Sequence, residues 1–352
     1  MASIRKLKSG KYHVEVRIKG HQPVRATFDR LTDAKTWANK IESDIHLGKH
    51  LNLKAKKYTV NQLIDKYIDE ELPKRNSDIK KFKMQLEWWR NEIGAYYLSA
   101  VTPELLSSSK NKLLTEPTLK PQKGKLNRSP ATVNRYMACI SIVFSKAVKE
   151  WGLLEKNPMF AISKEKESRG RVRFLSDVEQ EKLLKVCKEI SEDLFLFVLI
   201  AITSGARYSE ILHLRWQDLD FKNNQYHFID TKNGESRGVP IASIVSEKLK
   251  EKAKVRNLKS DYIFSTSDGK LIYIRGQFYK AIEKTKIKDF HIHDLRHCAA
   301  SYLAMNGANL LEIAEILGHK TLAMVKRYSH LTIKHTSRLI EDTAKKNIYK
   351  NL

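Results

Sequence analysis

The chain has 352 residues, enough for two or three domains of the usual size of roughly 100–200 residues. Its 65 Lys and Arg outnumber its 40 Asp and Glu, and the resulting net charge of +25 is spread along the chain, which predicts a polyanionic partner. The longest apolar run, residues 194–202, is far shorter than the roughly 20 residues that cross a bilayer, so a membrane partner is excluded. The basic N-terminus lacks the apolar segment of a secretory signal, and we therefore expect a cytoplasmic protein.

The spacing of the cysteines argues against two kinds of site that stabilise small domains. The three cysteines are widely spaced and form no CxxC pair, which disfavours both a disulfide framework and a zinc site: Cys139, Cys187 and Cys298. We expect them to be packing thiols.

The first predicted module covers residues 1–55. Apolar and polar residues alternate over residues 12–19, which predicts a half-buried β-hairpin with a largely basic outer face, followed by a helix that covers the apolar face. Residues 1–57 carry 14 Lys and Arg against 5 Asp and Glu. The outer face, with Arg17 and Lys19, is either a solvated sheet surface or a strand surface that enters a DNA groove.

The next predicted domain, residues 58–163, has a helical pattern throughout. Ser129 is a natural N-cap, Pro130 follows at the first helical position, and Gly152 ends that run. We expect this domain to be entirely helical. Residues 164–171 are charged and lack apolar periodicity, which is typical of a linker, and a third domain begins at residue 172.

Two candidate cationic residues lie in the first half of the third domain. Arg207 follows Gly205, which allows a tight turn, and Ser209 is expected to cap the helix that begins there. Lys232 comes directly before an Asn-Gly pair, a strong hairpin signal between two predicted strands. Each cation taken alone is more typical of a solvated surface charge than of a functional residue.

The second half of the third domain adds a group of histidines. In the segment "HIHDLRHCAASYLAMNG" an apolar stripe at helical spacing leaves His293, Arg296 and His297 together on another face. His319 follows a further predicted helix, and Tyr328 lies on the next one. A lone tyrosine in that position is usually a core aromatic.

Together these residue types favour phosphoryl transfer without a metal ion. The guanidinium groups of Arg207 and Arg296 can hold the non-bridging oxygens of a phosphodiester and neutralise the charge of the transition state. A tyrosine has a reference pKa of about 10, so Tyr328 needs a proton acceptor, for which His293 and His319 are the candidates. Lys232 on its hairpin can protonate the departing 5′-oxygen. No cofactor is expected.

The third domain resembles the tyrosine recombinases, the phage-type integrases, over residues 172–335. Five segments match that family's catalytic motifs in its order: "ARYSE", "TKNG", "HDLRH", "LGH" and "RYSH". The resemblance implies that Tyr328 is the nucleophile and that Glu210 and His297 support the site. It implies the following catalytic set: Arg207, Lys232, His293, Arg296, His319 and Tyr328.

The resemblance also implies the fold class and the domain order. We expect a multidomain, mainly α-helical chain with small β-sheets. An N-terminal three-stranded sheet plus helix, an arm-type DNA-binding domain (1–55), and a helical, SAM-like core-binding domain (58–163) would precede a linker (164–171). A mixed α+β tyrosine-recombinase catalytic domain (172–340) and a C-terminal tail (341–352) would follow.

The activity that the resemblance implies is site-specific recombination of double-stranded DNA at attachment sites. It proceeds through a covalent 3′-phosphotyrosyl intermediate and a Holliday junction in a homotetramer, without metal or ATP. The resemblance further implies the integration or excision of a mobile element such as a viral genome in the bacterial cytoplasm, in association with the nucleoid. DNA-bending or directionality factors are further partners of such enzymes.

Two other kinds of function compete with this one. A DNA invertase, a dimer resolvase or a type IB topoisomerase would use the same chemistry, although a separate basic N-terminal module favours an integrase. A non-catalytic DNA-binding protein on the same fold is the alternative from another class, and it would be expected to have lost part of the catalytic set. A covalent protein–DNA adduct distinguishes an enzyme from a binding protein.

Overall fold

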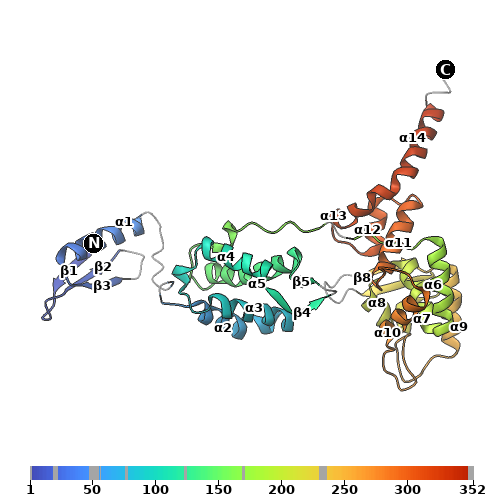
Figure 1. Cartoon of the computed structure of the whole chain (residues 1–352), viewed down its shortest axis with the longest axis horizontal. Helices are drawn as coiled ribbons and strands as arrows, with labels where there is room; N and C mark the ends of the chain where they lie inside the picture. The colour runs from blue at the N-terminus through green and yellow to red at the C-terminus, as the bar shows by residue number, and fades with distance from the viewer. Residues whose placement is uncertain are drawn as a thin grey trace. The chain divides into compact units, whose positions relative to one another are not determined.

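The computed structural model describes residues 2–18, 23–46, 55, 57–75, 78–122, 125–168, 171–229 and 236–347. The chain forms two compact units, residues 1–168 and 169–352 (Figure 1). The chain is mostly helical with small antiparallel sheets, which confirms the predicted fold class. None of the helices in the described ranges is long and apolar enough to cross a membrane.

The first unit begins with a three-stranded antiparallel sheet in the order β1-β2-β3, formed by Ala2–Lys6, Tyr12–Val16 and Val24–Phe28. The predicted alternation is confirmed, since Val14 and Val16 are buried. They pack against the apolar side of helix α1, Leu31–His46, which supplies Ala34, Ala38, Ile41 and Ile45 to this small core. A sheet of this size cannot bury its apolar face alone, so the helix is what completes the module.

Helices make up most of the remaining first unit: α2 (Val60–Glu70), α3 (Ile79–Ile93), α4 (Pro103–Thr115) and α5 (Pro130–Lys149). Ser129 caps α5 by accepting a hydrogen bond from the backbone of Thr132, with Pro130 at the first helical position, as predicted. The expectation of an entirely helical domain is wrong in one place. Strands β4 (Pro117–Gln122) and β5 (Lys125–Asn127) form an antiparallel pair between α4 and α5.

The segment predicted as a linker is tied at its start to the helical part of the first unit. The side-chain amide of Asn134 donates to the Glu165 carbonyl at 2.9 Å and accepts from the Glu165 amide at 2.8 Å. The Glu165 carboxylate also forms an ion pair with Lys110 at 2.8 Å. Residues 163–168 have no helix or strand, but these contacts hold Glu165 against α4 and α5.

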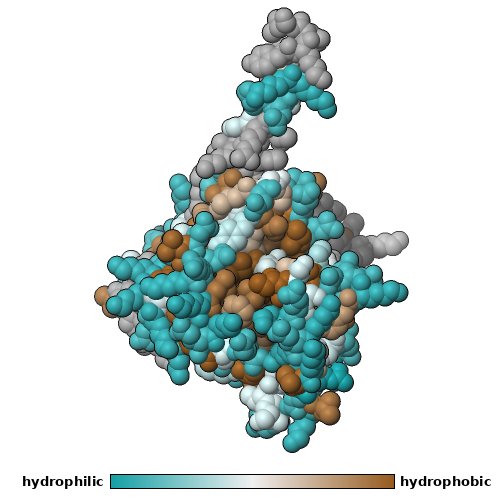
Figure 2. All heavy atoms as spheres, turned by 90° about the vertical axis from the view of Figure 1, so that its right-hand side faces the viewer, coloured by the Kyte–Doolittle hydropathy of each residue, from teal (hydrophilic) through white to brown (hydrophobic). Residues whose placement is uncertain are grey.

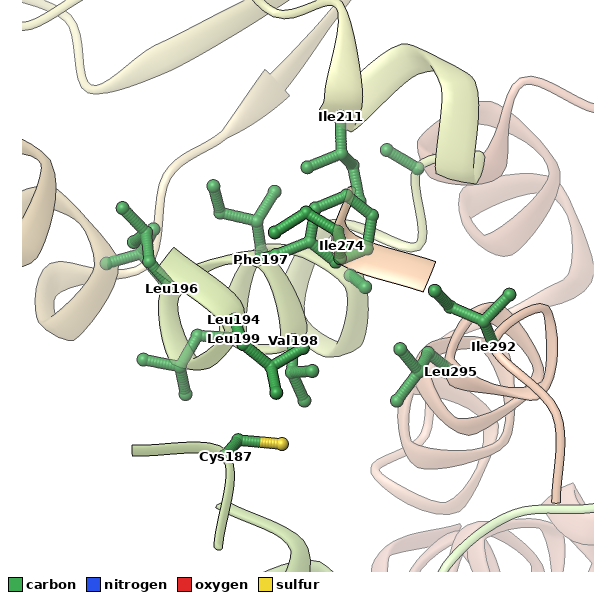
Figure 3. Close-up of a cluster of buried hydrophobic side chains, with 14 of the residues drawn as sticks. Cys187, Leu194, Leu196, Phe197, Val198, Leu199, Ile211, Ile274, Ile292 and Leu295 are labelled. Carbon is green, nitrogen blue, oxygen red and sulfur yellow. The ribbon is translucent and has the colours of Figure 1, made fainter. Parts of the chain in front are cut away.

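The second unit surrounds helix α7 (Glu192–Ser204), whose apolar side chains are almost all buried. Helices α6 (Asp177–Ile190), α9 (Ser243–Lys254), α10 (Ile274–Thr285) and α11 (Asp294–Met305) contact it. Figure 3 shows the labelled α7 side chains together with Ile211, Ile274, Ile292 and Leu295 in one cluster. This core fixes the start of α8 (Tyr208–Leu212) and the start of α11, where the candidate arginines lie.

Strands β6 (Leu219–Asp220), β7 (Gln225–Ile229) and β8 (Ser236–Pro240) form the antiparallel sheet of this unit. The two strands predicted on either side of the Asn-Gly pair are therefore present as β7 and β8, with Ile229 opposite Ser236. Four further elements complete the unit: α12 (Leu310–Leu317), α13 (Leu322–Val325), the 3-10 helix η6 (Lys326–Thr332) and α14 (Ile333–Asn347).

Helix α14 runs through residue 340, the predicted end of the catalytic domain, and Ile340 is exposed on it.

Figure 2 shows one face of the molecule, on which hydrophilic residues predominate and hydrophobic ones gather near the centre.

Candidate active site

Arg207 lies at the N-terminus of α8, directly after a left-handed turn. Gly205 ends α7 with φ +62°, a conformation that glycine adopts without strain. The prediction that Ser209 caps α8 is wrong, because the cap position is Arg207 itself. The Glu210 carboxylate accepts the Arg207 backbone N–H at 2.7 Å, so the acidic residue of the "ARYSE" motif satisfies a backbone donor at the start of the helix.

Glu210 also fixes the side chain of Arg207. Its carboxylate accepts from Arg207 Nη1 at 2.5 Å and from Arg237 Nη2 at 2.6 Å, so it lies between two guanidinium groups. Burial disfavours the ionised carboxylate, but hydrogen bonds from Arg237 and from the Arg207 backbone outweigh this, and the pKa of Glu210 is lowered. Arg237, on β8, also donates from Nε to the Ile316 carbonyl at 3.3 Å. The carboxylate therefore holds Arg207 in place while Arg237 joins the sheet to the end of α12.

Arg296 reaches the same region from the first turn of α11. Its side chain is buried, with 5% of the residue exposed, and Nη1 donates to the Gly205 carbonyl at 2.7 Å. Burial and the nearby charge of Arg207 lower the pKa of Arg296 to about 10, so the guanidinium remains charged at neutral pH. Two like charges in a buried place repel each other unless an anion joins them, and Glu210 offsets only part of that repulsion.

His319 follows α12, which ends at Gly318 in a second left-handed turn with φ +66°. Arg207 Nη2 lies 3.4 Å from the Gly318 carbonyl, and the His319 backbone N–H donates to the Ala314 carbonyl at 2.8 Å. Burial, followed by the charges of Arg296 and Arg207, lowers the pKa of His319 to about 4. A neutral imidazole thus stands beside the two arginines.

Tyr328 is buried, with 1% of the residue exposed, among side chains that include Val325 and Leu317. It lies on the 3-10 helix η6, which directly follows α13. Its hydroxyl is 2.5 Å from Nδ1 of His297, and the His297 ring meets that of His293 edge to face with centroids 5.3 Å apart. Burial raises the pKa of Tyr328, an effect that Arg327 and Arg296 reduce.

The sequence of this chain matches known proteins over most of its length. The sequence model of the Phage integrase family matches residues 173–335. The shufflon-specific DNA recombinase of Escherichia coli is 30% identical over 285 residues, which cover 79% of this chain and 70% of that protein. Tyrosine recombinase XerC of Thermodesulfovibrio yellowstonii is 30% identical over 231 residues, covering 60% of this chain and 74% of that protein. The chain belongs to the phage integrase family.

As a member of this family the protein is a tyrosine site-specific recombinase, which confirms the predicted enzyme class. Its fold agrees with that assignment. The crystal structure of a lambda integrase tetramer bound to a Holliday junction is similar with a TM-score of 0.61 at 17% identity, over 90% of this chain and 95% of that one. At this identity the likeness concerns the fold.

The described part of the recombinase brings together most of the side chains that the sequence singled out. Arg207, Glu210, Arg296 and His319 meet around the two glycine turns, and His293 and His297 lie with Tyr328 beside them. Lys232 lies outside the described residues, as does Lys19. Arg17 belongs to the first unit, where its guanidinium contacts Glu15 on the exposed side of the sheet.

Two arginines of this site were missed by the sequence analysis. Arg237 contacts Glu210, and Arg171 donates to the carboxylate of Asp294, the first residue of α11, at 2.7 Å. Asp294 also accepts the His291 backbone N–H, so Arg171 fixes the start of the helix that carries His293 and Arg296. Arg237 could have been found from the sequence, because it follows Lys232 by five residues and lies in the second of the two strands predicted there.

The close approach of the two glycine turns predicts a stability effect. A Cβ at Gly205 would lie 2.3 Å from Leu317 Cδ2, whereas a Cβ at Gly152, with φ +57°, meets nothing within 4 Å. Both Gly205→Ala and Gly152→Ala introduce left-handed strain of about 1–2 kcal/mol, but overpacking adds about 1–3 kcal/mol at Gly205 alone. We expect thermal unfolding of the full chain to show the larger shift for Gly205→Ala. Equal shifts would mean that Leu317 moves aside at no cost.

Proposed function

We propose that this recombinase breaks and rejoins double-stranded DNA at attachment sites through a covalent 3′-phosphotyrosyl intermediate on Tyr328, without metal or ATP. The observation that carries the proposal is the convergence of two charged guanidinium groups, those of Arg207 and Arg296, on the turns beside His319, next to the Tyr328 hydroxyl. An incoming phosphodiester would relieve the repulsion between the two arginines, so the site is arranged for an anion before the anion arrives.

Each predicted residue takes one role in the cleavage step. Arg207 and Arg296 hold the non-bridging oxygens, and the Glu210 carboxylate and the Gly205 carbonyl keep their guanidinium groups oriented. Tyr328 Oη gives its proton to a histidine of the site and forms a bond to phosphorus, while the bond from phosphorus to the 5′-oxygen breaks. The departing oxygen takes a proton from Lys232.

The neutral histidines complete the site. His319 offers an N–H donor to a non-bridging oxygen, because a neutral imidazole carries one proton that a hydrogen bond can use. Burial and Arg296 also lower the pKa of His293, so it too is held neutral beside the reacting groups. Hydrogen bonding by neutral imidazoles adds no further repulsion to a site that already contains two guanidinium charges.

The partners follow from the charge of the chain and from its relatives. DNA is the polyanion that a net charge of +25 favours, and a tetramer on a Holliday junction is the assembly of the lambda integrase with the similar fold. We also propose that Arg17 and Lys19 of the N-terminal module contact DNA. We further infer that the protein acts on the nucleoid in the bacterial cytoplasm, with DNA-bending or directionality factors as additional partners.

Integration or excision of a mobile element is the use that the basic N-terminal module favours. DNA inversion is a second candidate, because the E. coli relative is a shufflon-specific recombinase. The DNA that flanks the gene distinguishes them: direct repeats at the two ends of an element support integration, and short segments bounded by inverted repeats support inversion.

A covalent trapping experiment tests the catalytic proposal. The full chain is incubated with a site that carries a nick near the scissile phosphate, so that a short fragment diffuses away after cleavage and rejoining fails. We expect a protein–DNA band that survives denaturing electrophoresis and disappears after protease treatment. A complex that is retarded on a native gel but leaves no denaturant-resistant band would identify a non-catalytic DNA-binding protein instead.

A further inference from the structure

The hydroxyl of Tyr328 has a hydrogen-bond partner that the sequence did not favour. His293 and His319 were the expected proton acceptors, yet among the described histidines it is His297 whose ring nitrogen lies 2.5 Å from Tyr328 Oη. His297 is on the second turn of α11, directly after Arg296, and Tyr328 is on η6. Helix α11 packs against η6, so this contact belongs to a formed interface between two elements of the second unit.

The surroundings of this hydrogen bond keep both partners in their neutral forms. Burial, followed by the neighbouring His293, lowers the pKa of His297 to about 4; Arg327 and Arg296 act in the same direction, while Asp294 opposes them. Arg171 pairs with Asp294 and weakens that opposition. His297 is therefore neutral at neutral pH, and burial keeps the Tyr328 phenol protonated. With the imidazole proton on Nε2, the phenol donates and Nδ1 accepts.

We propose that His297 is the catalytic proton acceptor for Tyr328, taking the phenolic proton during strand cleavage and returning it during rejoining. This inference rests on the proposed function, in which Tyr328 is the nucleophile. In cleavage the Oη–P bond forms, the P–O5′ bond breaks, and the phenolic proton moves to His297 Nδ1. In rejoining the 5′-hydroxyl attacks and returns its proton to Lys232, the P–Oη bond breaks, and the His297 imidazolium protonates the departing phenolate.

The lowered pKa of His297 applies to the protein without bound DNA. A phosphodiester held by Arg207 and Arg296 brings a negative charge close to Arg296, one of the cations that lower the pKa of His297, and a nearby anion favours the imidazolium. Binding of the correct phosphate thus increases the basicity of the acceptor. A proton acceptor that strengthens only when the phosphate is in place would limit activation of the tyrosine on free enzyme.

His297 could instead only orient the Tyr328 hydroxyl by a hydrogen bond. Two variants distinguish this role from proton acceptance. His297→Gln keeps a side-chain oxygen that can accept a hydrogen bond but cannot take up a proton, whereas His297→Ala removes both properties. The readout is the single-turnover rate of covalent adduct formation on the nicked site. Binding of the same site on a native gel and circular dichroism verify that each variant is folded.

We expect both variants to slow adduct formation by on the order of 10²–10⁴-fold with little change in binding. A fluorinated tyrosine at position 328 should restore most of the lost rate in both variants. Its phenol is more acidic, so its deprotonation depends less on a general base. His213→Gln is the matched control. His213 is an exposed histidine at the end of α8 that contacts the Ser209 carbonyl, and this variant should react at the wild-type rate.

The pH profile supplies an independent readout. In wild type the adduct rate should fall as the pH drops through the pKa of His297 in the DNA complex and level off above it. In His297→Gln the rate should instead keep rising with pH.

Near wild-type rates for His297→Gln with a slow His297→Ala would overturn the proposal in favour of orientation alone. A loss that the fluorinated tyrosine does not reduce would overturn it as well. Failure of the proposed function is distinguishable from both outcomes, since either wild type would then form no adduct or an adduct would form in a chain that lacks the Tyr328 hydroxyl.

Discussion

Tyr328→Phe is expected to abolish the covalent protein–DNA adduct while leaving the affinity for the site almost unchanged. The hydroxyl is the only group removed, and most of the binding energy of such an interface comes from contacts to many phosphates. The ring of Tyr328 packs in a buried cluster that a phenylalanine ring fills equally well. Loss of the hydrogen bond to His297 costs about 0.5–1.5 kcal/mol, which the fold tolerates.

Tyr302→Phe is the matched control for this experiment. Tyr302 lies on α11 in the same unit, and its hydroxyl donates to the Leu175 carbonyl at 2.8 Å. This variant loses one partly buried hydroxyl and its hydrogen bond to Leu175, much as Tyr328→Phe loses its bond to His297, but it should still form the adduct. Both proteins are compared on the nicked site by denaturing and native electrophoresis. An adduct that persists in Tyr328→Phe would move the nucleophile to another residue.

The features that could be predicted from sequence are those whose cause is local. Alternation across β2 places Val14 and Val16 on the buried face, because strand side chains point to opposite sides in turn. The Ser129-Pro130 pair marks the start of α5 because both residues suit a helix N-terminus. The apolar stripe of α11 likewise leaves His293 and His297 one turn apart, and their rings meet.

The features that could not be predicted depend on residues that are distant in sequence. Arg237 and Glu210 are separated by 27 positions and His297 and Tyr328 by 31, and no spacing rule within a helix or strand relates such pairs. The five motifs, which occur in the family's order along the chain, indicated that the histidines and the tyrosine share a site. It did not indicate which histidine reaches the hydroxyl, because that depends on how η6 packs against α11.

The wrong cap at α8 has a related cause. Ser209 is a residue type that often caps helices, and by local preference it is the best candidate. Glu210 instead accepts the backbone N–H of Arg207 while it binds the guanidinium groups of Arg207 and Arg237, so one carboxylate joins one backbone group and two side chains. The tertiary contact with β8 makes the earlier helix start favourable.

The same contact bears on Lys232, which we propose as the proton donor. Ile229 and Ser236 face each other where β7 and β8 pair, and Arg237 next to Ser236 reaches Glu210. Strand β8, which begins four residues after Lys232 in the sequence, is thus anchored to the carboxylate that orients Arg207. A lysine at such a position can be either a proton donor or a contact to phosphate, and a chemical change in the substrate separates these two roles.

Replacing the bridging 5′-oxygen at the scissile phosphate by sulfur removes the need for a proton donor. The leaving group is then a thiolate, whose conjugate acid has a pKa of about 8.5 by the cysteine reference, so it departs unprotonated. We expect Lys232→Ala to be slower than wild type by on the order of 10²–10⁴-fold on the oxygen substrate and close to wild type on the sulfur substrate. Single-turnover rates of adduct formation measure both.

Three further variants test whether recovery of the rate on the sulfur substrate is specific to the loss of a proton donor. Arg207→Ala and Arg296→Ala should remain slow on both substrates, because these residues hold charge on the non-bridging oxygens, which the sulfur leaves unchanged. Lys222→Ala is the matched lysine control, since Lys222 is an exposed lysine in the other turn of the same sheet, between β6 and β7. Its ratio of oxygen to sulfur rates should equal that of wild type. If Lys232→Ala is as defective with sulfur as with oxygen, the lysine contacts phosphate, and the proton must come from His293 or from a water that it holds.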